Sequence, residues 1–113
     1  MDMQTRRETT MTGGAEGDAG DSTSAVIART ATITNRRGLH ARAAAKFVKL
    51  ATQFQAQVLV SNRGIEVSGL SIMGLMMLAA GPGSSIELKG TGVDAVQAVD
   101  ALTALIDAKF DED

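Results

Sequence analysis

The residues best suited to chemistry lie in the segment Gly38-Leu39-His40-Ala41-Arg42, and His40 is the only histidine of the chain. An imidazole has an unperturbed pKa of about 6.5, so at neutral pH it offers a neutral, nucleophilic nitrogen, and histidine can form covalent intermediates. A helical pattern begins at the next residue, and the free N–H groups at the start of a helix favour an anion. We therefore interpret His40 as the acceptor of a phosphoryl group, which its reactive N–P bond would keep transferable.

The charges around His40 are one-sided. No acidic residue occurs between Asp21 and Glu66, and we expect Arg42 to supply a second contact to the anion. The basic residues in this span are Arg29, Arg36, Arg37, Arg42, Lys46, Lys49 and Arg63.

Other roles for His40 are less well supported. Most single histidines are packed or surface residues, and Gly38, the helix start and Arg42 together weigh against that role here. A small hydrolase with His40 as its base is disfavoured because no carboxylate nearby in sequence orients the imidazole and no G-x-S-x-G motif is present. With one histidine and no cysteine, multi-histidine and thiolate metal sites are excluded, and we expect no metal and no cofactor.

The composition limits the class of protein further. The chain has 113 residues, a net charge of −2 and 3% aromatic residues, which argues against a protein that coats nucleic acid. No apolar run reaches the roughly 20 residues that cross a bilayer, and the N-terminus does not resemble a secretory signal. We therefore expect a small cytoplasmic protein that is not inserted in a membrane.

Residues 1–24 differ from the rest of the chain. They contain no branched aliphatic or aromatic residue and are rich in Thr, Gly, Asp and Ser. Such a segment cannot bury apolar surface to offset the entropy of ordering, so we predict a disordered N-terminal tail over residues 1–24. The folded domain is predicted to span residues 25–113.

The first half of this domain predicts a strand, a helix and a hairpin. Residues 25–34 are β-branched and partly alternating, which favours a strand with Ile27, Ala31 and Ile33 facing inward. A helix is predicted from Ala41, after a loop over residues 35–39. Its buried set is Ala44, Phe47, Val48, Ala51 and Phe54, and its water-facing set is Lys46, Lys49 and Gln53. Strands over residues 56–62 and 65–68 are joined by a reversal at Asn62-Arg63-Gly64.

The second half predicts a helix, a strand and a longer helix. The first helix spans residues 71–80, with Ser71 as N-cap and Gly81-Pro82-Gly83 as its stop. A strand over residues 85–91 follows, and Thr91 with Asp94 resembles a capping box for a helix over residues 93–109. The predicted buried face of that helix is Val96, Val99, Leu102, Leu105 and Ile106.

The resulting order is β-α-β-β-α-β-α. Strands and helices in this order predict an α+β fold, a two-layer open-faced β-sandwich whose four-stranded, mainly antiparallel sheet carries three helices on one face.

The helix over residues 71–80 has two apolar stripes. One is formed by Leu75, Leu78 and Ala79, and the other by Ile72, Met73, Met76 and Met77. A helix lying on a sheet buries one stripe, so the methionine-rich stripe is expected to be exposed for partners, unless the helix is buried all round. Ser71 either only caps this helix or is also a phosphorylation site, where added charge would alter the adjacent surface.

These motifs carry a resemblance to a known family. Gly38-Leu39-His40-Ala41-Arg42 resembles the active-site motif of HPr, the histidine phosphocarrier of the phosphoenolpyruvate-dependent phosphotransferase system, and Gly69-Leu70-Ser71-Ile72-Met73-Gly74 resembles its regulatory-serine segment. The resemblance covers residues 25–110 and implies phosphorylation of His40 at Nδ1 by enzyme I, assisted by Arg42, and transfer to a IIA-type protein. It implies that Ser71 is the target of an HPr kinase/phosphorylase. The implied docking surface comprises Ala41, Ile72, Met73, Met76 and Met77.

The chain departs from this family pattern at two positions. Ala43 stands where many members have proline, which should cost some rigidity, and Leu70 stands where several members with a phosphorylated serine have lysine. The segment over residues 36–46 is more similar to the nitrogen-related branch, often called NPr, which points to a regulatory phosphorelay. The expected protein is a monomeric carrier rather than an enzyme. The alternative is a regulatory interaction protein that is switched at Ser71 and no longer uses His40.

Overall fold

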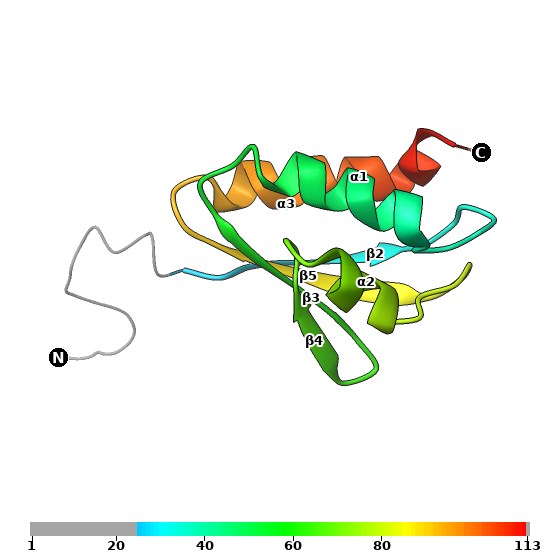
Figure 1. Ribbon diagram of the computed structural model, residues 1–113. Helices are drawn as coiled ribbons and strands as arrows, with labels where there is room; N and C mark the ends of the chain where they lie inside the picture. Colours follow the sequence, from blue (N-terminus) through cyan, green and yellow to red (C-terminus); the bar gives the residue numbers. More distant parts are fainter. Residues whose placement is uncertain (1–24, 113) are drawn as a thin grey trace, which may run out of the picture.

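The computed structural model describes residues 25–112 (Figure 1). The tail predicted over residues 1–24 lies outside the described residues. The elements are β2 (Ile27–Thr32), α1 (Ala41–Ala51), β3 (Gln57–Asn62), β4 (Ile65–Ser68), α2 (Ile72–Met77), β5 (Ser85–Thr91), α3 (Ala95–Asp107) and a 3-10 turn, η2 (Lys109–Asp111). The predicted β-α-β-β-α-β-α order is confirmed, and η2 is an addition to it.

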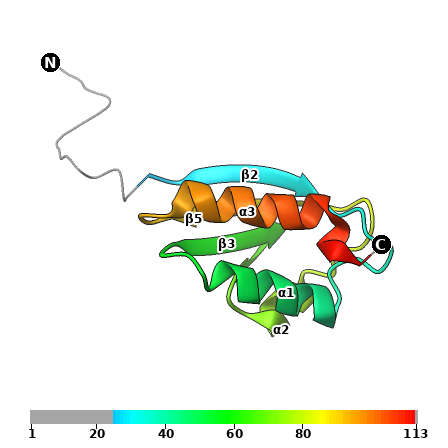
Figure 2. The same cartoon turned by 90° about the horizontal axis from the view of Figure 1, so that it is seen from above.

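The four strands form one sheet in the order β2-β5-β3-β4, and every neighbouring pair is antiparallel. The β3–β4 hairpin turns through Arg63 and Gly64, whose φ values of 54° and 83° suit a tight two-residue reversal. The helices cover one face of this sheet, as Figures 1 and 2 show. The predicted two-layer α+β fold is therefore confirmed.

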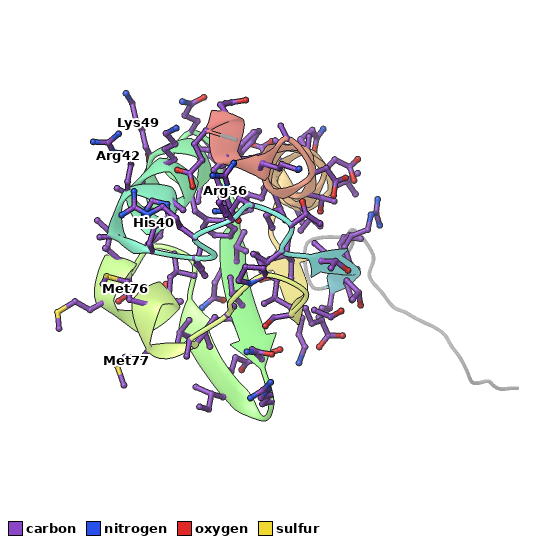
Figure 3. All side chains as sticks on the ribbon, turned by 90° about the vertical axis from the view of Figure 1, so that its right-hand side faces the viewer. Arg36, His40, Arg42, Lys49, Met76 and Met77 are labelled. Carbon is purple, nitrogen blue, oxygen red and sulfur yellow. The ribbon has the colours of Figure 1, made fainter. Side chains whose placement is uncertain are left out.

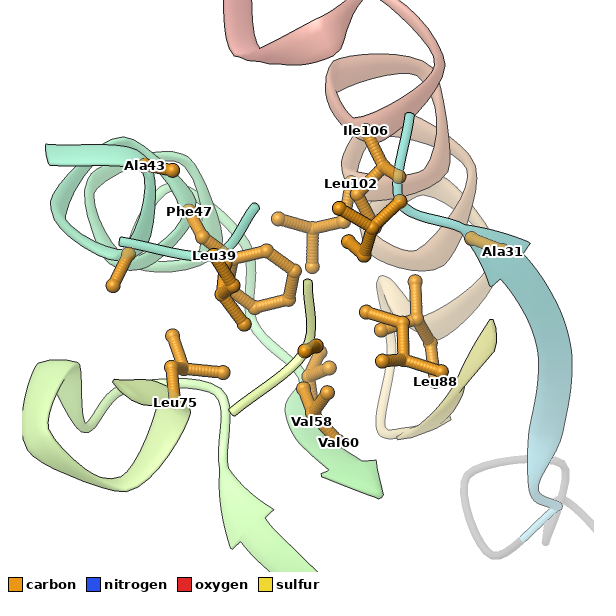
Figure 4. Close-up of a cluster of buried hydrophobic side chains, with 14 of the residues drawn as sticks. Ala31, Leu39, Ala43, Phe47, Val58, Val60, Leu75, Leu88, Leu102 and Ile106 are labelled. Atoms are coloured by element: carbon orange, nitrogen blue, oxygen red, sulfur yellow. The ribbon is translucent and has the colours of Figure 1, made fainter. Parts of the chain in front are cut away.

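The hydrophobic core lies between the sheet and the helices (Figure 4). Phe47 of α1, Leu88 of β5 and Leu102 of α3 are all fully buried, and each such side chain contributes about 1.5–3 kcal/mol relative to exposure. A Cβ at Gly90 would lie 2.7 Å from Val99 Cγ2, so glycine in β5 lets α3 approach the sheet closely. This packing fixes the start of α1, and with it His40, at one end of the sheet.

Helix α2 is shorter than predicted. It ends at Met77 rather than at Ala80, and Ala79 adopts a left-handed φ of 51°. The left-handed backbone of Ala79 ends the helical path, and just before it the carbonyl of Leu78 accepts a bond from buried Asn62 Nδ2 at 3.1 Å. The carbonyl of Ala80 accepts a bond from the backbone N–H of Leu39, outside the helix. The prediction that α2 continues to Gly81-Pro82-Gly83 is therefore wrong.

Helix α3 also differs from its prediction. It begins at Ala95, and its buried face uses Ala95 and Ala98, whereas Val96 is 46% exposed. The predicted capping box is wrong, because Asp94 Oδ2 accepts from the backbone N–H of Gln55 at 2.9 Å and makes no cap bond to its own helix.

Candidate functional site

The turn before α1 requires glycine. Gly38 has a φ of 68°, and a Cβ there would lie 2.7 Å from the carbonyl oxygen of Ala80. That same carbonyl accepts a bond from the N–H of Leu39 at 2.9 Å. Ala80, which follows α2, therefore contacts this turn at both Gly38 and Leu39 and fixes the backbone that leads to His40.

His40 is the N-cap residue of α1. Its backbone is extended, with φ −81° and ψ −179°, and its carbonyl accepts the first helical bond from Ala44 at 2.8 Å. The imidazole makes no capping bond, and no acidic residue occupies the first turn of α1. The ring therefore lies beside the positive end of a helix and is available for other contacts.

The imidazole contacts a carboxylate from the far end of the domain. His40 Nε2 lies 2.8 Å from Glu112 Oε2 and 3.0 Å from Oε1, and both side chains are only 15% exposed. No carboxylate lies near His40 in the sequence, but the fold brings Glu112 from 72 residues away to orient this ring. The signal that could have found Glu112 is charge: the acidic end of the chain complements the acid-free stretch around His40.

Asn35 supports the same contact. Its side chain is fully buried, and its Nδ2 donates to Glu112 Oε2 at 2.9 Å and to the carbonyl of Gly38 at 2.8 Å. The hydrogen bonds from His40 and then from Asn35 are the main causes that hold the pKa of Glu112 below its ordinary value, against an opposing effect of desolvation. Glu112 is thus an ionised acceptor at neutral pH.

The turn η2 delivers Glu112 to the site. Phe110 is fully buried, and Lys46 Nζ donates to its carbonyl at 2.6 Å. Three successive residues, Lys109 to Asp111, have left-handed φ values of 58°, 55° and 60°, which reverse the chain after α3. Lys46 was predicted to face water, and this is corrected: it is half-buried because its ammonium group anchors η2 on α1.

The predicted partner residues share one side of the molecule with His40. Figure 3 shows Arg42 and Lys49 projecting from α1 on the side that also carries Met76 and Met77. Arg42 is exposed, and its contact with a bound anion stays a prediction. Ala41, in the same first turn of α1, is exposed as well.

Helix α2 has the predicted exposed stripe, but only Leu75 of the predicted buried stripe lies in the helix. Leu78 is buried just after the helix, and Ala79 is exposed. Leu75 is fully buried, whereas Met73 and Met77 are 75% and 70% exposed, so the alternative of a helix buried all round is wrong. The exposed stripe also contains Ile72 and Met76.

Ser71 caps α2, as predicted. Its Oγ accepts from the N–H of Gly74 at 2.9 Å. Ser71 and His40 thus occupy the N-termini of two different helices, α2 and α1, which pack against each other.

Within residues 25–112, no helix has the length and apolar character needed to cross a membrane.

Known proteins resemble this chain over nearly all of the described region. The family model described as the phosphorylation site of the phosphotransferase-system HPr component matches residues 27–108. The phosphocarrier protein HPr of Cupriavidus necator is 51% identical over 87 residues, which cover 77% of this chain and 98% of that protein. The phosphocarrier protein NPr of Shewanella violacea is 48% identical over 86 residues, covering 76% and 94%.

Solved structures show the same fold. A crystal structure of HPr from Thermoanaerobacter tengcongensis matches with a TM-score of 0.74 and 40% identity, covering 77% of this chain and 98% of that one. Another structure from that organism, an HPr dimer, matches with a TM-score of 0.60 and 42% identity, covering 69% and 90%. These relatives are phosphocarrier proteins, which agrees with the prediction that this chain is a carrier rather than an enzyme. The chain belongs to the HPr family of phosphotransferase-system phosphocarrier proteins.

Proposed function

We propose that this protein carries a phosphoryl group on His40, which it receives from phosphorylated enzyme I, and ultimately from phosphoenolpyruvate, and passes to a IIA-type protein. The observation that carries the proposal is the position of the only histidine, at the N-cap of α1 in a member of the HPr family. A carrier of this kind works in the cytoplasm, without a metal or cofactor.

The site suits the charge of the transferred group. Phosphoryl transfer depends on positioning and on compensation of charge, rather than on covalent chemistry by the protein. The free N–H groups at the start of α1 and the guanidinium group of Arg42 would compensate the phosphoryl oxygens. Arg42 is exposed in the free protein, so it can close on the group once the group is bound.

The exposed stripe of α2 supports docking of both partners on one surface. Ala41, Ile72, Met73, Met76 and Met77 form an adaptable apolar surface near the phosphorylated ring, and methionine suits a surface that binds more than one protein. A monomer leaves this surface free for each partner in turn. We therefore propose a monomer, although a related HPr forms a dimer.

Ser71 is a proposed regulatory site for an HPr kinase/phosphorylase. A phosphate on its Oγ would lie at the start of α2 and place about two negative charges beside the apolar docking surface. Leu70, which is 55% exposed, replaces a lysine that would attract such a phosphate.

The second candidate is a regulatory interaction protein that is switched at Ser71 without use of His40. The exposed methionines favour it, because they suit binding whether or not a phosphoryl group is transferred. A hydrolase with His40 as base is less favoured. Although Glu112 now supplies an orienting carboxylate, the relatives are phosphocarriers.

The deciding experiment is the intact mass after incubation with phosphoenolpyruvate and an enzyme I. We expect one added phosphoryl group that brief acid treatment removes, and no addition to His40→Ala. An unchanged mass with an active enzyme I would contradict the carrier function and favour the regulatory protein.

The branch can be tested with the acceptor. The chain is 51% identical to an HPr and 48% identical to an NPr, and the two branches differ in the IIA-type protein that accepts the phosphoryl group. We propose the nitrogen-related branch from the segment over residues 36–46, and expect faster transfer to a nitrogen-type IIA protein than to a sugar-type one. Equal or slower transfer to the nitrogen-type protein would contradict this assignment.

A further inference from the structure

The contact between Glu112 and His40 has a chemical consequence for the proposed transfer. An ionised carboxylate has no proton to donate, so the imidazole nitrogen facing both of its oxygens must be the donor. With the proton on Nε2, the neutral ring carries its lone pair on Nδ1. The structure therefore relates the identity of the nucleophilic atom to a residue 72 positions away.

We propose that Glu112 is a positioning residue for phosphoryl transfer, which fixes His40 in the Nε2-protonated tautomer and directs the phosphoryl group to Nδ1. This proposal rests on the function proposed above. The family match ends at residue 108, before Glu112, so the role is read from the contacts of this chain.

The step balances without a further reactant. The Nδ1 lone pair becomes the N–P bond, while the bond between phosphorus and the donor breaks and its electron pair returns to the donor. The ring gains positive charge and keeps its proton on Nε2. The carboxylate at Nε2 compensates this charge, as the aspartate of a Ser-His-Asp triad compensates its imidazolium. In onward transfer the N–P pair returns to Nδ1.

One direct contact to Glu112 and two contacts of the preceding turn hold this residue in place. Asn35 uses both N–H groups of its buried amide, one on Glu112 and one on Gly38. Phe110 anchors the turn in the core, and Lys46 binds the Phe110 carbonyl. The lowered pKa of Glu112, caused mainly by His40 and Asn35, agrees with an ionised carboxylate in this position.

The test uses Glu112→Ala and a matched control. Asp111→Asn removes the same charge from the neighbouring residue, which is exposed, and asparagine tolerates its left-handed φ of 60°. Nitrogen-15 NMR of the unphosphorylated proteins reads the tautomer directly, because the single histidine gives one set of ring signals. The rate of transfer from phosphorylated enzyme I is measured on the same samples.

We expect wild type and Asp111→Asn to be Nε2-protonated and to react at similar rates. Glu112→Ala should gain a measurable Nδ1-protonated population and lose about tenfold or more in rate, the scale for loss of a group that orients a functional histidine. Wild-type tautomer populations in Glu112→Ala, with or without a slower rate, would overturn the proposal.

The experiment distinguishes failure of the carrier function from failure of the role proposed for Glu112. If wild type is not phosphorylated at all, the carrier function fails while the tautomer measurement still reports on Glu112. Amide spectra of both variants establish that the domain is folded, so a change in the ring signals is not a consequence of unfolding.

Discussion

At the scale of single residues, the backbone conformation of Gly38 determines where the His40 ring lies. Gly38 both adopts a left-handed φ and touches the carbonyl of Ala80 where a side chain would begin. This turn sets the direction in which the chain enters α1, and therefore where the His40 ring lies.

Gly38→Ala should lower the free energy of unfolding by about 2–4 kcal/mol, because it adds left-handed strain and a backbone clash. Gly64→Ala is the matched control. Gly64 also has a positive φ, but its Cβ would meet no atom within 4 Å, so we expect only about 1 kcal/mol there. Urea unfolding of both variants measures the difference, and equal losses would contradict the role of the clash.

Glu112 should make stability depend on pH. Its pKa is lower in the folded protein than its ordinary value of 4.5, so folding favours the ionised form. The stabilisation is fully present above the unfolded pKa and is lost as the pH falls through the folded pKa. Urea unfolding should therefore show wild type more stable than Glu112→Gln at pH 6, with the difference shrinking below pH 4.5. A difference that grows on acidification would contradict this assignment.

At the scale of elements, η2 connects the core to the site. One face of the turn is buried through Phe110, and the next residues lead to Glu112. The bond from Lys46 ties this turn to α1, the helix that His40 begins.

Lys46→Met should destabilise the protein by about 1–2 kcal/mol, because it leaves the Phe110 carbonyl without its charged donor. Lys49→Met, on the exposed side of the last turn of α1, should change stability by less than about 0.5 kcal/mol. Thermal unfolding compares the two variants. Similar melting temperatures for both would mean that the bond to η2 contributes little.

The elements also show which features could be predicted from the sequence alone. The strands, the β3–β4 hairpin and the cap at Ser71 follow from alternation, turn residues and a capping side chain, all of which are local. The early end of α2 was missed because it occurs at Ala79, which adopts a left-handed φ of 51° that is unusual for alanine and has no signal in the local sequence. Glu112 was also missed, since periodicity carries no information about pairs 72 residues apart.

At the scale of the whole molecule, the residues proposed to react and to bind partners gather on one side. His40, Arg42, Met76 and Met77 lie on one side of the molecule (Figure 3), whereas Val93 is an exposed apolar residue just before α3. This distribution allows the docking surface to be tested without disturbing the core.

Met73→Glu and Met77→Glu should each weaken binding to enzyme I about tenfold or more, because a charge would be buried in an apolar contact. Stability should change little, since the side chains are 75% and 70% exposed. Val93→Glu, at 69% exposure, is the matched control and should leave binding unchanged. Calorimetric titration with enzyme I measures all three, and equal losses would contradict a docking surface on α2.

If Glu112 fixes the tautomer of His40 as proposed, the left-handed turn at Lys109–Asp111 makes that tautomer sensitive to local opening of the chain. Segments near the end of a domain open at a lower free energy than the whole fold, and three residues of unfavourable backbone lower that free energy here. Each opening removes Glu112 from Nε2 while the sheet and helices stay folded. On warming, the population of the Nε2-protonated tautomer and the rate of phosphoryl transfer should therefore fall before the domain unfolds.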